Sequence, residues 1–128
     1  MAAYAKVVGR SQQQSADAGA AIDTGHLSRM TLGEASLQRE VLALFDRQAD
    51  ILLPRIRCGT PAVALGLAHT LKGSAVGIGA FRVARAAEAV EQAHAAKVRD
   101  AAALAAIDTL AAVLDETKAE IARLLRRP

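Results

Sequence analysis

Apolar residues recur every three or four positions along most of the chain, which is the spacing that gives an α-helix one buried face. No sustained alternation of β-branched or aromatic residues accompanies this pattern, so no strands are expected. The pattern predicts five helices: a short one after Ile22, and longer ones over residues 34–59, from Pro61 to about Gly77, from about Ala80 to between His94 and Val98, and from Asp100 to about Leu125.

Two of these helices show the clearest apolar stripes, and both stripes are expected to face the core. In the helix over residues 34–59 the stripe consists of Leu37, Val41, Leu44, Phe45, Ile51, Leu52 and Ile56. In the last helix it consists of Leu104, Ile107, Ala111, Leu114, Ile121 and Leu125, and Lys118 interrupts it. A proline removes a backbone hydrogen bond and clashes with the preceding turn, so Pro54 predicts a kink or an early stop.

Short connections join the four longer helices, and helices joined in this way pack in alternating directions. The predicted fold is therefore all-α: an antiparallel up-down four-helix bundle with a short additional N-terminal helix. Residues 11–19 are polar and lack periodic apolar positions, so we expect a flexible leader over residues 1–21 and the bundle over residues 22–128.

The composition favours closely packed helices. Hydrophobic residues make up 52% of the 128 positions and aromatic residues only 2%, so the core must consist of Leu, Ile, Val and Ala. One cysteine excludes an intrachain disulfide and, with three scattered histidines, argues against a structural zinc site; it fits a reducing, cytoplasmic setting. No apolar run approaches the roughly 18 residues of a membrane span, and no signal peptide is recognisable.

The net charge of +3 is a mild basic excess. Nucleic acid is a poor candidate partner, because the chain has almost no aromatic side chains that could stack on bases. A mild basic balance suits an acidic protein partner instead.

The candidate chemistry lies in one stretch, Ala68-His69-Thr70-Leu71-Lys72-Gly73-Ser74-Ala75, continued by Ile78-Gly79-Ala80. On a helix, His69 is surrounded by Gly66, Lys72, Gly73 and Val76, and Gly77 lies one turn further on. Glycine inside a helix costs about 0.5–1 kcal/mol relative to alanine. Glycines grouped around one histidine therefore suggest that something large must reach the ring.

This stretch resembles the signature of histidine-containing phosphotransfer (HPt) domains, and the helices around it extend the resemblance to about residues 22–125. The resemblance implies a helical bundle that presents one phosphorylatable histidine, His69, to response-regulator receiver domains. It further implies that the receiver's aspartate pocket supplies Mg²⁺, so that this chain needs no cofactor or metal site of its own. Nothing in the sequence resembles an ATP-binding domain, so we expect a phosphocarrier without kinase activity.

The chemistry of the neighbouring residues agrees with this implication. A neutral imidazole offers one nitrogen lone pair as a nucleophile, and phosphoryl transfer depends mainly on positioning and on charge. Lys72, one turn after His69, can place an ammonium near the phosphoryl oxygens; a solvated surface lysine is the alternative. Gly66, Gly73, Val76 and Gly77 then form the expected partner-docking face.

The remaining polar candidates are weaker. Glu91 and Gln92 lie about one helix later, and either could meet the far nitrogen of the His69 ring and fix its tautomer; an ordinary surface position is the alternative. Ser74 points away from His69 on the helix, so a small core residue is expected there. His26 and His94 lie outside the motif and are expected to be structural or surface histidines.

The sequence thus predicts a phosphorelay intermediate that accepts a phosphoryl group on His69 from a receiver-domain aspartate and transfers it to another receiver domain. Its partners would be receiver domains and a hybrid histidine kinase, without nucleic acid or membrane, and the chain would be a monomer. The alternative from another class is an adaptor bundle that docks and inhibits a histidine kinase or receiver without carrying phosphate. A third interpretation is that the chain is a phosphorylated segment of a longer kinase.

Overall fold

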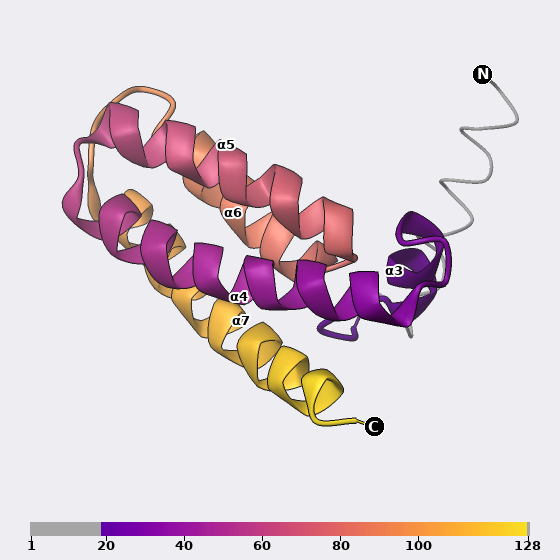
Figure 1. The fold of residues 1–128 in the computed structure, drawn as a ribbon. Coiled ribbons are helices and arrows are strands. Elements are labelled where there is room, and N and C mark those ends of the chain that lie inside the picture. Colours follow the sequence, from indigo (N-terminus) through magenta and orange to yellow (C-terminus); the bar gives the residue numbers. More distant parts are fainter. Residues whose placement is uncertain (1–18, 128) are drawn as a thin grey trace, which may run out of the picture.

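The computed structural model describes residues 19–127, and this part of the chain forms helices without any strand (Figure 1). The helices are α3 (Thr24–Met30), α4 (Ala35–Cys58), α5 (Pro61–Ile78), α6 (Phe81–Ala93) and α7 (Ala101–Leu125). The predicted all-α class is confirmed, and every predicted helix has a counterpart in the structure. Most of the leader predicted over residues 1–21 lies outside the described residues.

The four longer helices pack in a closed ring, in which α4 contacts α5 and α7, and α6 contacts the same two helices. The short α3 packs against α5. In Figure 1 the ribbon doubles back at each connection between the longer helices. Among the helices described, none has both the length and the apolar composition that a membrane crossing requires. The enclosed core is aliphatic apart from Phe45, and its largest fully buried apolar side chains are Ile56, Leu71, Val83, Val90, Ile107, Leu110, Leu114 and Ile121.

Small side chains dominate what α5 and α6 bury. Each helix buries three alanines: Ala64, Ala68 and Ala75 on α5, and Ala84, Ala86 and Ala87 on α6. Because the distance between packed helices follows the size of the side chains at the contact, these alanines let the two helices approach closely. Side chains at the edge of α6 can therefore reach the exposed flank of α5.

Side-chain oxygens cap the starts of three helices. Asp23 accepts a hydrogen bond from the backbone of His26 at 3.0 Å at the start of α3. Thr60 accepts one from the Val63 backbone before α5, and Asp100 accepts one from the Ala103 backbone before α7. Such caps satisfy backbone N–H groups that have no partner within the helix.

Gly79 ends α5 in the left-handed conformation, at φ 81°. A Cβ atom added there would lie 2.7 Å from the backbone oxygen of Asp23, a distance that real Cβ atoms essentially never show. The Asp23 backbone N–H also donates to the Gly79 oxygen at 2.9 Å. This close backbone contact joins the end of the motif helix to the start of α3, and only glycine fits it without strain.

The end of α4 is held by an arginine from the α6–α7 connection. The guanidinium of Arg99 donates to the Arg57 oxygen at 2.6 Å and to the Ile56 oxygen at 2.9 Å. The last carbonyls of a helix have no partner within it, so this fork supplies bonds that the helix itself cannot make.

A kink or an early stop was predicted at Pro54, and the early stop is wrong, because α4 continues through this proline to Cys58. Pro54 lies on the exposed side of the helix, and so does Asp50, whose carbonyl loses its usual partner. Water can bind a carbonyl on that side, so the missing hydrogen bond does not end the helix.

The predicted apolar stripes are partly wrong. Leu37, Leu44 and Ile51 of α4 are exposed by 36%, 58% and 58%, and Leu104 of α7 is exposed by 47%. The buried face of α4 consists of Leu42, Phe45, Ala49, Leu52 and Ile56, and that of α7 consists of Ala103, Ile107, Leu110, Leu114, Thr117 and Ile121. A second apolar row, with a spacing of seven, therefore runs along α4 outside the core.

Lys118, which interrupts the predicted stripe of α7, holds α7 to α4. Its ammonium lies 2.6 Å from an Asp46 carboxylate oxygen and 2.7 Å from an Asp50 carboxylate oxygen. Burial alone would lower the pKa of Lys118, but the hydrogen bonds and charges of the two aspartates outweigh it, so the pKa is raised. The two aspartates stand one turn apart on α4, so one lysine fixes the register of both helices.

Replacing Lys118 with methionine should lower the free energy of unfolding by about 1 kcal/mol, since two partly exposed ion pairs are lost while the aliphatic stem is retained. The folded-state pKa is raised, so this contribution is complete below the unfolded value of 10.5 and is lost as the pH rises through the folded pKa. Urea unfolding at pH 7 and above pH 10.5 measures both effects. In a chain that already carries Asp46→Asn and Asp50→Asn, the same change should cost far less; an equal cost there would assign the effect to packing.

Candidate functional site

His69 lies on the outer side of α5 with its side chain 69% exposed. Ala68 and Leu71 are fully buried on the other side of the same helix, and their burial orients the helix so that His69 faces solvent. The ring nitrogen Nδ1 lies 2.9 Å from Oε2 of Glu91 on α6. The motif helix therefore displays the ring to solvent, and a neighbouring helix holds one of its two nitrogens.

Glu91 has a second partner. Its other oxygen, Oε1, lies 3.0 Å from the ammonium of Lys72, which is one turn beyond His69 on α5. The Glu91 side chain is only 17% exposed, whereas that of Lys72 is 29% exposed. One carboxylate thus bridges the imidazole and the ammonium, and we name His69, Lys72 and Glu91 the charge cluster.

The protonation state of the carboxylate fixes the tautomer of the ring. Burial, the largest effect, would raise the pKa of Glu91, but hydrogen bonds from Lys72 and His69 and the charges of these groups outweigh it, so the pKa is lowered. An ionised carboxylate can only accept hydrogen bonds, so Nδ1 must donate and must carry the proton. A neutral His69 ring then has its lone pair on Nε2, the nitrogen that faces away from Glu91.

The helix surface around His69 carries little side-chain bulk, because glycines occupy three of its positions. A Cβ atom added at Gly66, Gly73 or Gly77 would have no neighbour within 4 Å, so these glycines border open space rather than a tight helix contact. Gly66 and Gly73 are exposed, Gly77 is half-buried, and Val76 is 42% exposed. The four residues predicted to form the docking face thus lie at or near the surface.

Comparison with protein families gives one match, to the Hpt domain over residues 38–126. The chain belongs to the Hpt domain family. The matched range contains all three residues of the charge cluster. Hpt domains are phosphocarrier modules of two-component signalling, act with receiver domains and kinases, and are not kinases themselves. No curated protein and no solved structure matches the chain.

Of the two residues predicted to meet the ring, the structure brings only Glu91 to it. Gln92 is exposed and forms no hydrogen bond with His69. Ser74 is half-buried and lines a groove between α4 and α5, on the side of α5 away from Lys72. Within residues 19–127, no group of three or more His, Cys, Asp or Glu side chains could hold a metal ion in this Hpt domain.

The two other histidines of the chain, His26 and His94, are packed against protein groups. The ring of His26 stands edge-on to Phe81, with the ring centres 5.0 Å apart. His94 is fully buried at the end of α6, and its Nδ1 lies 2.8 Å from the Val90 oxygen, to which it donates. Neither ring has the combination of exposure and neighbouring charge found at His69.

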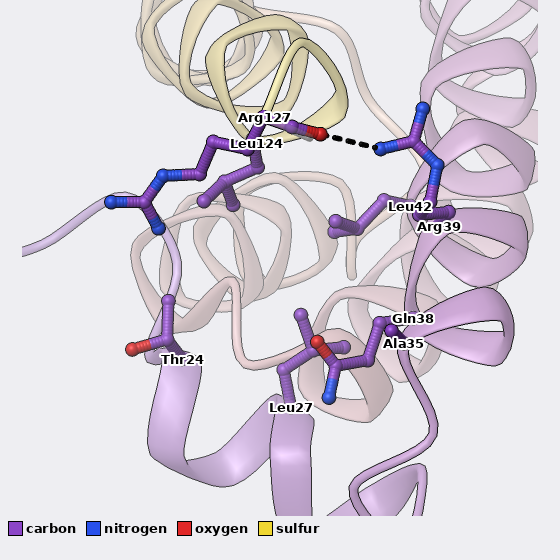
Figure 2. A pocket seen from close by; sticks show the side chains of 8 residues that line it. All are labelled: Thr24, Leu27, Ala35, Gln38, Arg39, Leu42, Leu124 and Arg127. Atoms are coloured by element: carbon purple, nitrogen blue, oxygen red, sulfur yellow. Dashed lines mark hydrogen bonds between the residues drawn. The ribbon is translucent and has the colours of Figure 1, made fainter.

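Two grooves were not foreseen from the sequence. The groove between α4 and α5 has a volume of about 420 Å³ and is lined by Leu44, Arg47, Gln48, Ile51, Leu52 and Ser74. A larger one of about 550 Å³ opens between α3, α4 and the end of α7, and no residue of the charge cluster lines it (Figure 2). There the Arg39 guanidinium donates to the Arg127 oxygen at 3.4 Å. The seven-residue spacing of Leu37, Leu44 and Ile51 is the sequence signal that could have indicated the first groove, because two of these residues line it.

The open space around Gly73 allows a prediction about stability. Replacing Gly73 with alanine should raise the free energy of unfolding by up to about 1 kcal/mol, because alanine is the better helix former and its Cβ meets no neighbour. Gly73→Glu should also fold, but should fail to exchange phosphate with receiver domains, since its side chain projects beside His69. Melting temperature and transfer rate measured on the same proteins test this. A Gly73→Glu protein that unfolds, or one that transfers normally, would contradict the docking face.

Proposed function

We propose that this Hpt domain is a phosphorelay intermediate, which accepts a phosphoryl group on His69 from a receiver-domain aspartate and transfers it to another receiver domain. The observation that carries this proposal is the 2.9 Å contact between Nδ1 of His69 and Glu91 on an otherwise exposed ring. This contact orients the ring and leaves the Nε2 lone pair free toward solvent. An antiparallel four-helix bundle would serve as the rigid support.

The reaction requires little from the chain beyond this arrangement. The Nε2 lone pair forms a bond to phosphorus while the bond from phosphorus to the aspartate oxygen breaks, and its electron pair leaves with the aspartate carboxylate. Onward transfer reverses these steps with a second receiver. Such reactions are accelerated mainly by positioning and by charge, and the Mg²⁺ that helps is expected on the receiver.

Lys72 supplies the mobile positive charge in this proposal. An ammonium on a flexible four-carbon stem can turn from Glu91 toward oxygen atoms attached to Nε2, because Lys72 lies one helical turn beyond His69 on α5. There it would offset the negative charge of the transferring group.

The receiver would dock over the predicted docking face, whose residues Gly66, Gly73, Val76 and Gly77 carry little side-chain bulk. The exposed Leu44 and Ile51 of α4 flank the groove that also contains Ser74 of α5, so exposed apolar side chains of α4 lie beside α5. Exposed apolar groups next to a site of transfer are typical of protein-binding surfaces. A hybrid histidine kinase would supply the first receiver, and a reducing cytoplasmic setting suits the single cysteine.

His69→Gln should remove phosphate transfer without loss of the fold, because this side chain is exposed and makes one hydrogen bond. The measurement follows acid-labile, base-stable label from a phosphorylated receiver to this chain, with circular dichroism as the check on folding. Label that persists on His26 or His94 in this variant would overturn the assignment of His69. If the wild-type chain binds a receiver but never takes label, the adaptor function is the correct one.

Lys72→Ala should slow transfer by about tenfold or more, as expected when a charge that acts on the transferring group is lost. The free energy of unfolding should change by no more than about 0.5 kcal/mol, since the Lys72 side chain is partly exposed and Glu91 keeps its contact with the His69 ring. Single-turnover transfer rates and thermal melts of the same samples separate the two effects. A large loss of stability with an unchanged rate per folded molecule would make Lys72 a structural residue.

A further inference from the structure

The groove between α3, the start of α4 and the end of α7 has an apolar base. Leu27 of α3 and Leu42 of α4 are almost fully buried there, and Leu124 of α7 is half-buried beside them. The volume of about 550 Å³ is enough to accept several side chains of another molecule. The groove thus offers leucine side chains from three helices to whatever enters it.

The charged residues that line this groove are all basic. Of the eight described residues that line it, two are arginines and none is acidic. Figure 2 shows the guanidiniums of Arg39 and Arg127 on opposite sides, with Leu42 and Leu124 between them. The bond from Arg39 to the Arg127 oxygen is long, at 3.4 Å, and a guanidinium carries five N–H donors. Among the described residues, most donors of Arg39 therefore remain available to a ligand.

The acidic residue whose charge interacts with Arg127 is already engaged elsewhere. The pKa of Glu120 on α7 is lowered mainly by the hydrogen bond from Arg123, and to a smaller extent by the charge of Arg127. Both carboxylate oxygens of Glu120 are bound by Arg123, at 2.8 and 2.6 Å. Arg126 adds another exposed positive charge next to Arg127 in the chain. The groove is therefore apolar at its base and positively charged at its edges.

We propose that this groove binds an acidic, leucine-containing segment of a partner protein, with its apolar side chains on the three leucines and its carboxylates at Arg39 and Arg127. Charge complementarity selects this occupant, because a basic segment would be repelled. Nucleic acid fits less well, since no aromatic side chain lines the groove for a base to stack on. An amphipathic segment that lays its apolar face in a groove is a recurring mode of peptide recognition.

A segment bound here would lie apart from the charge cluster. His69 and the docking face are on α5, and α5 contributes no residue to the lining of this groove. One protein could therefore hold the chain by the groove while a receiver meets His69. Binding in the groove needs no phosphate, so it does not depend on the proposed function.

The probe is a synthetic peptide of about 11 residues, or three helical turns, in which pairs of leucines alternate with pairs of glutamates. Lysine replaces glutamate in one control peptide, and serine replaces leucine in the other. Each peptide is titrated into the full ¹⁵N-labelled chain at about 0.1 M salt, where exposed charges more than about 10 Å apart are screened from each other. The titration gives the Kd and identifies the residues whose amide signals shift.

Ala35→Glu is the most direct variant. Ala35 is exposed, lines the groove and stands in the first turn of α4, where a negative charge suits the helix dipole. Ser36→Glu is its matched control, because it places the same charge one residue later, outside the groove lining. Arg126→Gln is the control for Arg39→Gln and Arg127→Gln in the same way. Circular dichroism checks that each variant is folded.

The leucine–glutamate peptide should shift amide signals of α3, the start of α4 and the end of α7. Arg39→Gln and Arg127→Gln should each raise its Kd about threefold, as expected for the loss of one exposed ion pair. Ala35→Glu should raise the Kd about tenfold or more, because it adds a like charge inside the groove. Ser36→Glu and Arg126→Gln should stay within about twofold of wild type. Both control peptides should bind at least about tenfold more weakly.

The remaining outcomes would overturn the proposal. They are a peptide that does not bind at about 1 mM, signals that shift on α5 instead, and a Kd that Ala35→Glu leaves unchanged. If Ala35→Glu does not fold, an unchanged Kd in both Arg39→Gln and Arg127→Gln has the same force. Phosphatidylglycerol vesicles that shift the groove signals when the peptide does not would assign the groove to a membrane surface. The same shifts on raising the protein concentration alone would assign it to a second copy of this chain.

Discussion

The contact between Glu91 and the His69 ring depends on how closely α6 approaches α5, and the chemistry of the site follows from that approach. Both helices bury several alanines, and alanine is a small side chain that lets neighbouring helices pack closely. A carboxylate is short, so it spans the gap to the ring and to Lys72 only if the helices are near. The same packing leaves Glu91 poorly hydrated, which strengthens its interactions with both partners.

Much of this arrangement could be predicted from the sequence. The positions of the helices follow from apolar periodicity and from capping residues such as Asp23, Thr60 and Asp100, since these signals are local. The spacing of His69, Lys72 and Gly73 also follows, because one helix holds them all. The choice between Glu91 and Gln92 did not follow. Successive residues on a helix point about 100° apart, and the rotation of α6 about its axis is set by packing against other helices.

The exposed row on α4 shows a second limit of the sequence. Leu37, Leu44 and Ile51 satisfy the helical period as well as the residues of the true core do, so periodicity alone cannot tell a buried face from a second apolar face. The difference arises from tertiary structure: among the described helices α4 packs mainly against α5 and α7, and Leu44 and Ile51 stay exposed at the edge of the groove beside α5. A helix with two apolar faces in a small bundle is therefore a reason to ask what covers the second.

The glycines in and around the motif stretch are required for two different reasons. At Gly79 a side chain would collide with the Asp23 backbone, and the left-handed φ already disfavours other residues. At Gly66, Gly73 and Gly77 an added Cβ atom would meet nothing within 4 Å. A library of variants selected only for folding should therefore keep glycine at position 79 and accept many residues at the other three. The same library selected for signalling should keep all four, so the difference between the two selections would map the footprint of the partner without a structure of the complex.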